Sequence, residues 1–130
     1  MRSLLINICR YLVLHTTYGI CQDDMKLRFI FEEEDIWDDP KSCGYYLAFQ
    51  GIKDSIHIRA AHARIGHKLF AILAHELAHR IVRRVFQIKN DDTSDGVDGH
   101  GPIFQGIKKT MKMRFDTAIH SRIKKKFPFQ

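Results

Sequence analysis

The feature that most constrains this chain is the segment Ile72–Val82, ILAHELAHRIV, which places two histidines and a glutamate among apolar side chains. Apolar residues recur at helical spacing over about residues 65–88, so the segment is predicted to lie within one amphipathic helix. Residues four apart share a helix face, so His75 and His79 should project side by side. Burying two imidazoles and a carboxylate without partners is costly, whereas one bound cation would satisfy all three.

This H-E-x-x-H spacing is typical of a zinc site. Two imidazole nitrogens one helical turn apart can both reach an ion at about 2 Å, and Zn²⁺ is the usual occupant of such a pair. Glu76 lies beside His75, where it is poorly placed to be a third ligand but can reach a water on the ion. The motif therefore predicts one Zn²⁺ ion, with His75 and His79 as ligands and Glu76 as the general base.

A catalytic zinc ion normally takes three protein ligands and keeps one position open. The best third candidate is His100, in DGHGP, because Gly99 and Gly101 permit close backbone approach and Pro102 suits the first position of a following helix. We therefore favour His100 as the third ligand. Four aspartates of the same loop stay alternative oxygen ligands: Asp91, Asp92, Asp95 and Asp98.

The remaining histidines are expected to lie outside this site. His67 precedes His75 by eight residues on the same helix, about 12 Å along its axis, which is too far for a shared ion. His57 alternates with two isoleucines in a predicted strand, so its side chain is expected at the surface, as is that of His62 before the helix. Two others have no supporting context for a role in the site: His15 and His120.

Strand and helix patterns alternate along the chain in a way that predicts an α+β fold. A helical stripe near the N-terminus is followed by strand-like alternation over 25–31, then by the predicted strands Tyr45–Gln50 and Ser55–Ala60. Short connections favour antiparallel neighbours in a three-stranded meander. After the metal helix and a loop over 90–101, a last helix should begin at Pro102, and its core packing should end near Ile119. We expect one domain over residues 1–130, with a basic tail from about residue 120.

The charge is unevenly distributed. The chain carries 21 Lys and Arg against 15 Asp and Glu, a net charge of +6, and basic residues load the C-terminal end. Such an end favours an anionic partner such as DNA, although a solvated surface has the same composition. The candidate nucleic-acid-binding residues are Lys108, Lys109, Lys112, Arg122, Lys124, Lys125 and Lys126.

Cysteine usage and the N-terminus favour an intracellular protein. Three scattered cysteines without a C-x-x-C argue against a disulfide scaffold and against a cysteine-based zinc ribbon. Arg10 interrupts the N-terminal apolar run, no cleavage site follows it, and no segment approaches the length of a membrane span. We expect a monomer in the cytoplasm, nucleoid or nucleus, neither secreted nor bound to a membrane.

HELAH followed downstream by HGPIF resembles the SprT-like zinc metallopeptidases, which include the Spartan-type DNA–protein crosslink proteases. The family pattern is H-E-x-x-H followed, after a variable loop, by H-G-x-x-F or H-G-x-x-W. The residues that carry it here are His75, Glu76, His79, His100, Gly101 and Phe104. The resemblance covers residues 65–113 in detail. It implies a small zincin-like domain, three histidine ligands, a glutamate base, and hydrolysis of peptide bonds, with DNA-associated or DNA-crosslinked proteins as candidate substrates.

The family also implies an edge strand before the metal helix that pairs with an extended substrate, the position that Ser55–Ala60 holds in this sequence. Three features depart from the family pattern. The loop between His79 and His100 is longer, no cysteine after Cys43 could form a C-terminal zinc ribbon, and Arg80 stands where zincins usually carry an uncharged residue.

Two other functions compete with the peptidase. A deformylase also combines H-E-x-x-H with a cysteine ligand, for which Cys43 is available, but its glycine-rich strand motif is absent and HGPIF would be unexplained. The alternative from a different class is a zinc-stabilised nucleic-acid-binding module without turnover. Structural zinc sites usually have four ligands, and the sequence offers three, which favours the enzyme.

Overall fold

A computed structural model describes residues 2–17, 27–33, 42–47, 54–64, 66–86 and 100–126, with side chains up to residue 120. The predicted α+β class is confirmed. The elements in chain order are α1 (Arg2–Thr17), β1 (Arg28–Glu32), β2 (Gly44–Leu47), β3 (Ser55–Arg59), the short 3₁₀ helix η3 (Ala60–His62), α2 (His67–Arg84) and α3 (Pro102–Lys126).

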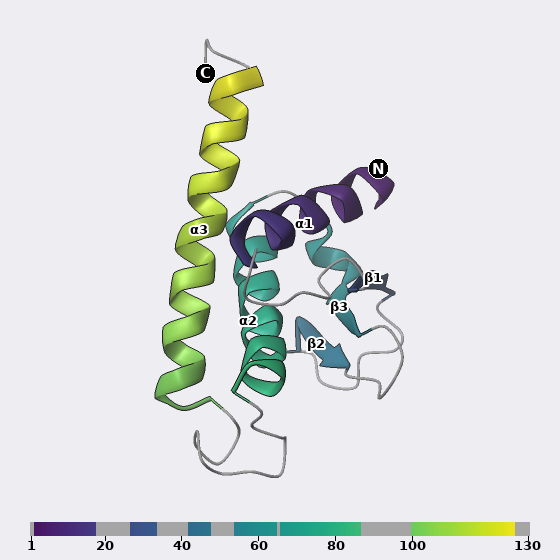
Figure 1. The fold of residues 1–130 in the computed structure, drawn as a ribbon. Coiled ribbons are helices and arrows are strands. Elements are labelled where there is room, and N and C mark those ends of the chain that lie inside the picture. The colour runs from purple at the N-terminus through teal and green to yellow at the C-terminus, as the bar shows by residue number, and fades with distance from the viewer. Residues whose placement is uncertain are drawn as a thin grey trace.

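Helix α2 lies at the centre of the molecule (Figure 1). It packs along α3 on one side and contacts β2 and β3 on the other, while α1 crosses over and contacts both α3 and β1. Helix α3 extends past the other elements at its C-terminal end and stays helical to Lys126. The predicted basic tail therefore begins as helix, because nothing in SRIKKK, free of proline and glycine, breaks the helical pattern before residue 126.

The sheet is mixed, with the strand order β1–β3–β2. Strand β1 runs parallel to β3, and β2 pairs with β3 in antiparallel fashion. The predicted antiparallel meander is therefore wrong for β1, and β3 is the central strand. All five residues of β3 are buried, which suits a strand with a neighbour on each side and packed faces. The expectation that Ser55–Ala60 forms an edge strand is wrong as well; β2 is the edge strand that contacts α2.

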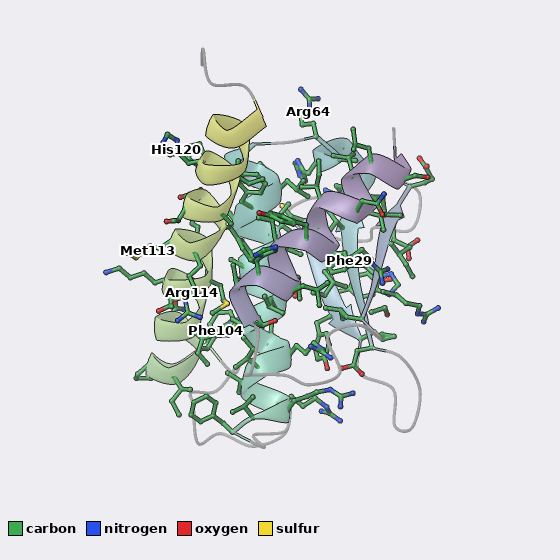
Figure 2. All side chains as sticks on the ribbon, turned by 45° about the horizontal axis from the view of Figure 1, so that its top comes forward. Phe29, Arg64, Phe104, Met113, Arg114 and His120 are labelled. Atoms are coloured by element: carbon green, nitrogen blue, oxygen red, sulfur yellow. The ribbon has the colours of Figure 1, made fainter. Side chains whose placement is uncertain are left out.

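The core fills the space between α1, the sheet, α2 and α3. Leu12, Ile56, Leu73, Leu77 and Phe115 are among its completely buried side chains. Within this arrangement Phe29 of β1 points beneath α1, and Phe104 of α3 points toward α2 (Figure 2). Burial of this kind on both sides fixes the rotation of α2 about its own axis.

His57 contradicts the expectation of a surface position, since only 8% of it is exposed. Its ring lies between polar partners on its own strand and on β1: Nε2 is 2.8 Å from the Ser55 hydroxyl and Nδ1 is 2.6 Å from a Glu32 carboxylate oxygen. Tyr45 stacks on the ring with centroids 4.3 Å apart. These contacts replace water and explain how an imidazole can be buried beside two isoleucines. Ser55 is completely buried, so its hydroxyl cannot contact a substrate. The contacts of His57 with Ser55 and Glu32 therefore stabilise the fold.

Candidate metal centre

The first two predicted ligands lie on one face of α2. His75 and His79 are both half-buried, and their rings meet edge to face with centroids 4.9 Å apart. The residues between and around them, including Leu77 and Ala78, are completely buried against the rest of the fold. The apolar stripe therefore turns the two imidazoles toward the same side of the helix.

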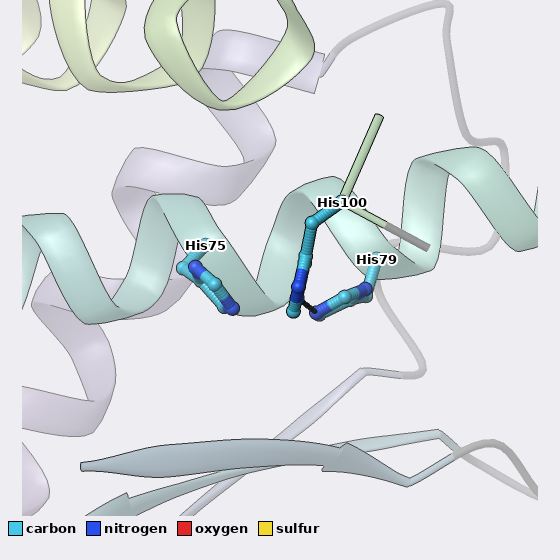
Figure 3. A group of neighbouring side chains, drawn as sticks. All are labelled: His75, His79 and His100. Carbon is cyan, nitrogen blue, oxygen red and sulfur yellow. Dashed lines mark hydrogen bonds between the residues drawn. The ribbon is translucent and has the colours of Figure 1, made fainter. Parts of the chain in front are cut away.

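His100 comes to this face from two positions before the start of α3 at Pro102. Its ring centroid is 5.1 Å from that of His75 and 4.9 Å from that of His79. Its Nε2 atom is 3.1 Å from Nε2 of His79. Figure 3 shows the three imidazoles directed to one point beside α2. Each offers one nitrogen, and these nitrogens all lie within 4.8 Å of one another.

This arrangement fits a divalent cation. Three nitrogens bound to one tetrahedral zinc ion would be about 3.4 Å apart, compared with 3.1 Å between His79 and His100 and at most 4.8 Å within the group, so side-chain rotations would close the site. Burial lowers the pKa of both His75 and His79 to about 4, helped by nearby positive charge. Both imidazoles are therefore neutral at pH 7 and keep a lone pair for a metal. His100 is exposed, so solvent reaches the site from its side.

Glu76 lies next to these histidines and is only 6% exposed. Burial raises the pKa of its carboxyl to about 7, although the positive charge of Lys108 opposes the shift. A carboxyl with a pKa near neutral pH can accept and release a proton with little change in free energy, as a general base and acid must. Glu76 and His75 both line a cavity of about 350 Å³ that opens between α2, α3 and the start of β2.

Phe104 supports all three histidines. Its ring centroid is 4.9 Å from His75, 4.4 Å from His79 and 4.8 Å from His100, and the side chain is completely buried. It also packs against Ala78 and Val82 of α2. Phe104 therefore joins the start of α3 to the metal face of α2 and limits the rotation of the imidazoles, which gives the phenylalanine of HGPIF a physical role.

Sequence reasoning missed the residue that anchors the metal helix, Asp54. This buried carboxylate accepts hydrogen bonds from Arg80 Nε at 3.1 Å, Arg84 Nε at 2.7 Å and the Tyr46 hydroxyl at 2.7 Å. Burial opposes ionisation, but the hydrogen bonds from Arg84 and Tyr46 and the positive charge outweigh it and hold the pKa of Asp54 below its ordinary value. The sequence did contain one sign of such an acidic partner, because Arg80 and Arg84 are four apart and so lie on one face of α2. The contact with Asp54 also explains why Arg80, only 1% exposed, follows the second histidine.

Other predicted residues lie outside the histidine cluster. Lys108 lines the cavity beside Glu76, whereas Lys109 is exposed and Lys112 is half-buried on α3. Four basic candidates belong to α3, but their side chains lie outside the described part of the chain: Arg122, Lys124, Lys125 and Lys126. The alternative oxygen ligands also lie outside the described residues: Asp91, Asp92, Asp95 and Asp98.

The remaining histidines lie away from this cluster, as expected: His15, His67 and His120 are exposed, and His62 is half-buried in η3. Cys43, the candidate deformylase ligand, lines the cavity. Among the described residues, however, the group able to hold a metal ion is His75, His79 and His100.

The chain has no match among protein-family models, curated proteins or solved structures. Within the part of the chain that the structure describes, no helix is both long and apolar enough to cross a lipid bilayer. Function must therefore be inferred from the site itself.

Proposed function

We propose that this protein is a zinc-dependent metalloendopeptidase of the SprT-like type. The observation that carries the proposal is the convergence of the imidazole nitrogens of His75, His79 and His100 within 4.8 Å, beside a buried glutamate and an accessible cavity. Three imidazole nitrogen ligands with an open side are the donor set of a catalytic rather than a structural zinc ion.

In this proposal, the histidines, Glu76 and Phe104 have separate roles in peptide hydrolysis. A zinc ion held by the three histidines would supply a Lewis acid for the scissile carbonyl and for the attacking water. Glu76, with its pKa raised to about 7, accepts the proton of that water and then delivers it to the leaving amine. The Phe104 ring keeps the three imidazoles in position during both proton transfers.

Strand β2 is suited to hold an extended substrate. It ends the described sheet on the side of α2, and an exposed strand edge can pair with a peptide backbone. Gly44, its first residue, lets β2 pack closely against β3 and α2: a Cβ there would lie 2.7 Å from the His57 carbonyl oxygen and 2.8 Å from Cγ2 of Ile72. The same missing side chain leaves open the space in front of Glu76, whose carboxylate would be 3.5 Å away.

DNA-associated or DNA-crosslinked proteins are the proposed substrate class. The net charge of +6 and the basic residues along α3 support it, because positive charge concentrates a protein near nucleic acid. The same charge supports the alternative function, a zinc-stabilised nucleic-acid-binding module without turnover. Glu76 argues for the enzyme, since a binding module has no use for a buried carboxyl beside the metal ligands.

The test combines metal analysis with a cleavage assay on a DNA-bound protein, with and without single-stranded DNA. We expect one zinc ion per chain, cleavage by the parent protein, and retained zinc but no cleavage in the Glu76→Gln variant. Cleavage by that variant at the parental rate would refute the assigned base. Zinc binding and salt-sensitive DNA binding without any cleavage would favour the binding module instead.

A further inference from the structure

The cavity beside the metal centre extends well beyond the histidines. It continues from His75 and Glu76 toward the N-terminal end of α2, past Ile72 and Ala71 to Lys68. Residues Ser42 to Gly44, which lead into the edge strand β2, form its opposite wall. With a volume of about 350 Å³, it has ample room for a substrate side chain, and it starts where the scissile bond would lie.

Among the described residues that line this cavity, two of the three charged groups are positive. Lys68 reaches it from α2, Lys108 reaches it from α3, and the third is Glu76. The positive charge of Lys108 also lowers the pKa of His75, of Glu76 and of His79, as expected for an ammonium group that faces the site. Lys108 is half-buried, whereas its neighbour Lys109 is exposed and does not line the cavity.

We propose that this cavity is a substrate subsite that binds the carboxylate side chain of a glutamate or aspartate next to the scissile peptide bond, with Lys108 and Lys68 as the residues that recognise it. The inference rests on the proposed peptidase function. Ala71 and Ile72 offer an apolar wall for the methylene groups of such a side chain, and the two ammonium groups offer hydrogen-bond donors and charge for its carboxylate.

A nucleic-acid phosphate fits this position less well. The cavity lies between the edge strand and the metal helix, in line with the path of a peptide paired to β2, and it is enclosed on three sides by β2, α2 and α3. A nucleic-acid backbone repeats its charge along an extended groove, so it would need basic residues in a row rather than two at one pocket. Lys108, which the sequence placed among DNA-binding candidates, is thereby reassigned to the peptide site.

The experiment uses the zinc-loaded protein and a mixture of peptides randomised around a cleavable bond, with products identified by mass spectrometry. We expect Glu and Asp to be enriched over Gln and Asn at one position next to the cleaved bond. The Lys108→Gln variant should reduce this enrichment about tenfold, the effect of losing one charge-assisted hydrogen bond. The Lys108→Glu variant should prefer Lys or Arg at that position.

Arg64 provides the matched control. It projects into solvent ahead of α2 and does not line the cavity, so Arg64→Gln removes one positive charge from the protein without changing the pocket (Figure 2). This variant should keep the parental preference. If it lost the preference to the same extent as Lys108→Gln, the effect would come from net charge and the subsite would be refuted.

Binding of a glutamate peptide and its glutamine counterpart to the zinc-loaded Glu76→Gln protein separates the subsite from turnover. Tighter binding of the glutamate peptide, lost in the Glu76→Gln, Lys108→Gln double variant, supports the subsite even if the parent cleaves nothing and the peptidase proposal fails. Cleavage without acidic preference, or equal binding of both peptides, overturns the subsite and leaves the peptidase proposal intact. A Lys108→Gln change that weakens only oligonucleotide binding also overturns it, in favour of a nucleic-acid contact.

Discussion

The Nε2 atom of His100 lies 3.1 Å from Nε2 of His79, although 21 positions separate the two residues in sequence. The ring of His75 completes the group from the preceding turn of α2. A shared cation gives this proximity a physical reason, because it binds all three lone pairs at once.

Replacement of His100 by alanine should remove metal-dependent stability. His100 is exposed, so the metal-free variant should unfold at nearly the same temperature as the metal-free parent. Free zinc at 100 times its Kd stabilises a one-site protein by about 2.7 kcal/mol, and the variant should lose most of this gain. Thermal unfolding with a chelator measures the metal-free stability, and thermal unfolding with zinc measures the stabilisation that the metal adds. The control is His120→Ala, an exposed histidine on α3 that should respond to zinc like the parent.

Replacement of Glu76 by glutamine should stabilise the metal-free protein at high pH. Burial raises the folded-state pKa of Glu76 from 4.5 to about 7, so between these values the folded chain holds more protons than the unfolded chain. The free energy of unfolding of the parent therefore falls as pH rises through this window. Above pH 7, keeping this buried carboxylate ionised costs on the order of 3 kcal/mol of folding stability. The glutamine variant has no carboxylate and avoids this cost.

Urea unfolding of the chelator-treated parent and Glu76→Gln proteins at pH 4.5 and pH 8 checks this difference. Both proteins carry the same histidines, and Glu76 is not among the causes that lower the pKa of His75 or of His79, so the comparison isolates the Glu76 carboxyl. The variant should be clearly more stable at pH 8 and nearly equal to the parent at pH 4.5. A stability difference that does not change with pH would show that Glu76 is not held in a desolvated position.

Replacement of Asp54 by alanine should destabilise the whole domain. It would leave the Arg80 guanidinium, 1% exposed, without its buried counter-ion, and breaking a buried ion pair in this way costs about 3–5 kcal/mol. Arg84 contacts the same carboxylate but its side chain is 35% exposed, so Arg84→Gln should cost no more than about 1 kcal/mol. Urea unfolding of both variants measures the contrast. Equal losses would contradict the anchoring role of Arg80.

Replacement of Phe104 by alanine should weaken both the fold and the metal site. Loss of a fully buried phenylalanine costs about 3–5 kcal/mol. Because the ring also contacts all three histidines, zinc affinity should fall about 10- to 100-fold, as when residues that orient metal ligands are removed. Phe115→Leu, a core change on α3 outside the site, should lower stability while zinc affinity, measured by competition with a chelator under folding conditions, stays at the parental value.

Local patterns predicted much of this molecule. The apolar stripe of 65–88 located α2, and the glycine–proline context of His100 located the start of α3, because both depend on neighbours in sequence. The strand order could not be read in this way. Short connections favoured a meander, but β3 lies between the other two strands, where all five of its residues are buried.

The burial of His57 and Asp54 could not be predicted from the local sequence pattern either. His57 alternates with apolar residues as a surface residue would, and only its partners Glu32 and Ser55 explain its burial. Asp54 looked like a turn residue until the structure placed Arg80 and Arg84 against it. Long-range pairs of this kind leave little trace in one sequence, because each partner alone resembles an ordinary surface residue.

The most direct test of the metal centre is zinc X-ray absorption spectroscopy on the zinc-loaded protein in solution. The proposed site predicts one ion with three imidazole nitrogens and one oxygen, all at about 2.0 Å, and loss of one imidazole in the His100→Ala variant. A sulfur scatterer at about 2.3 Å, which would bring Cys43 into the ligand set, or a spectrum unchanged in that variant, would contradict the three-histidine centre.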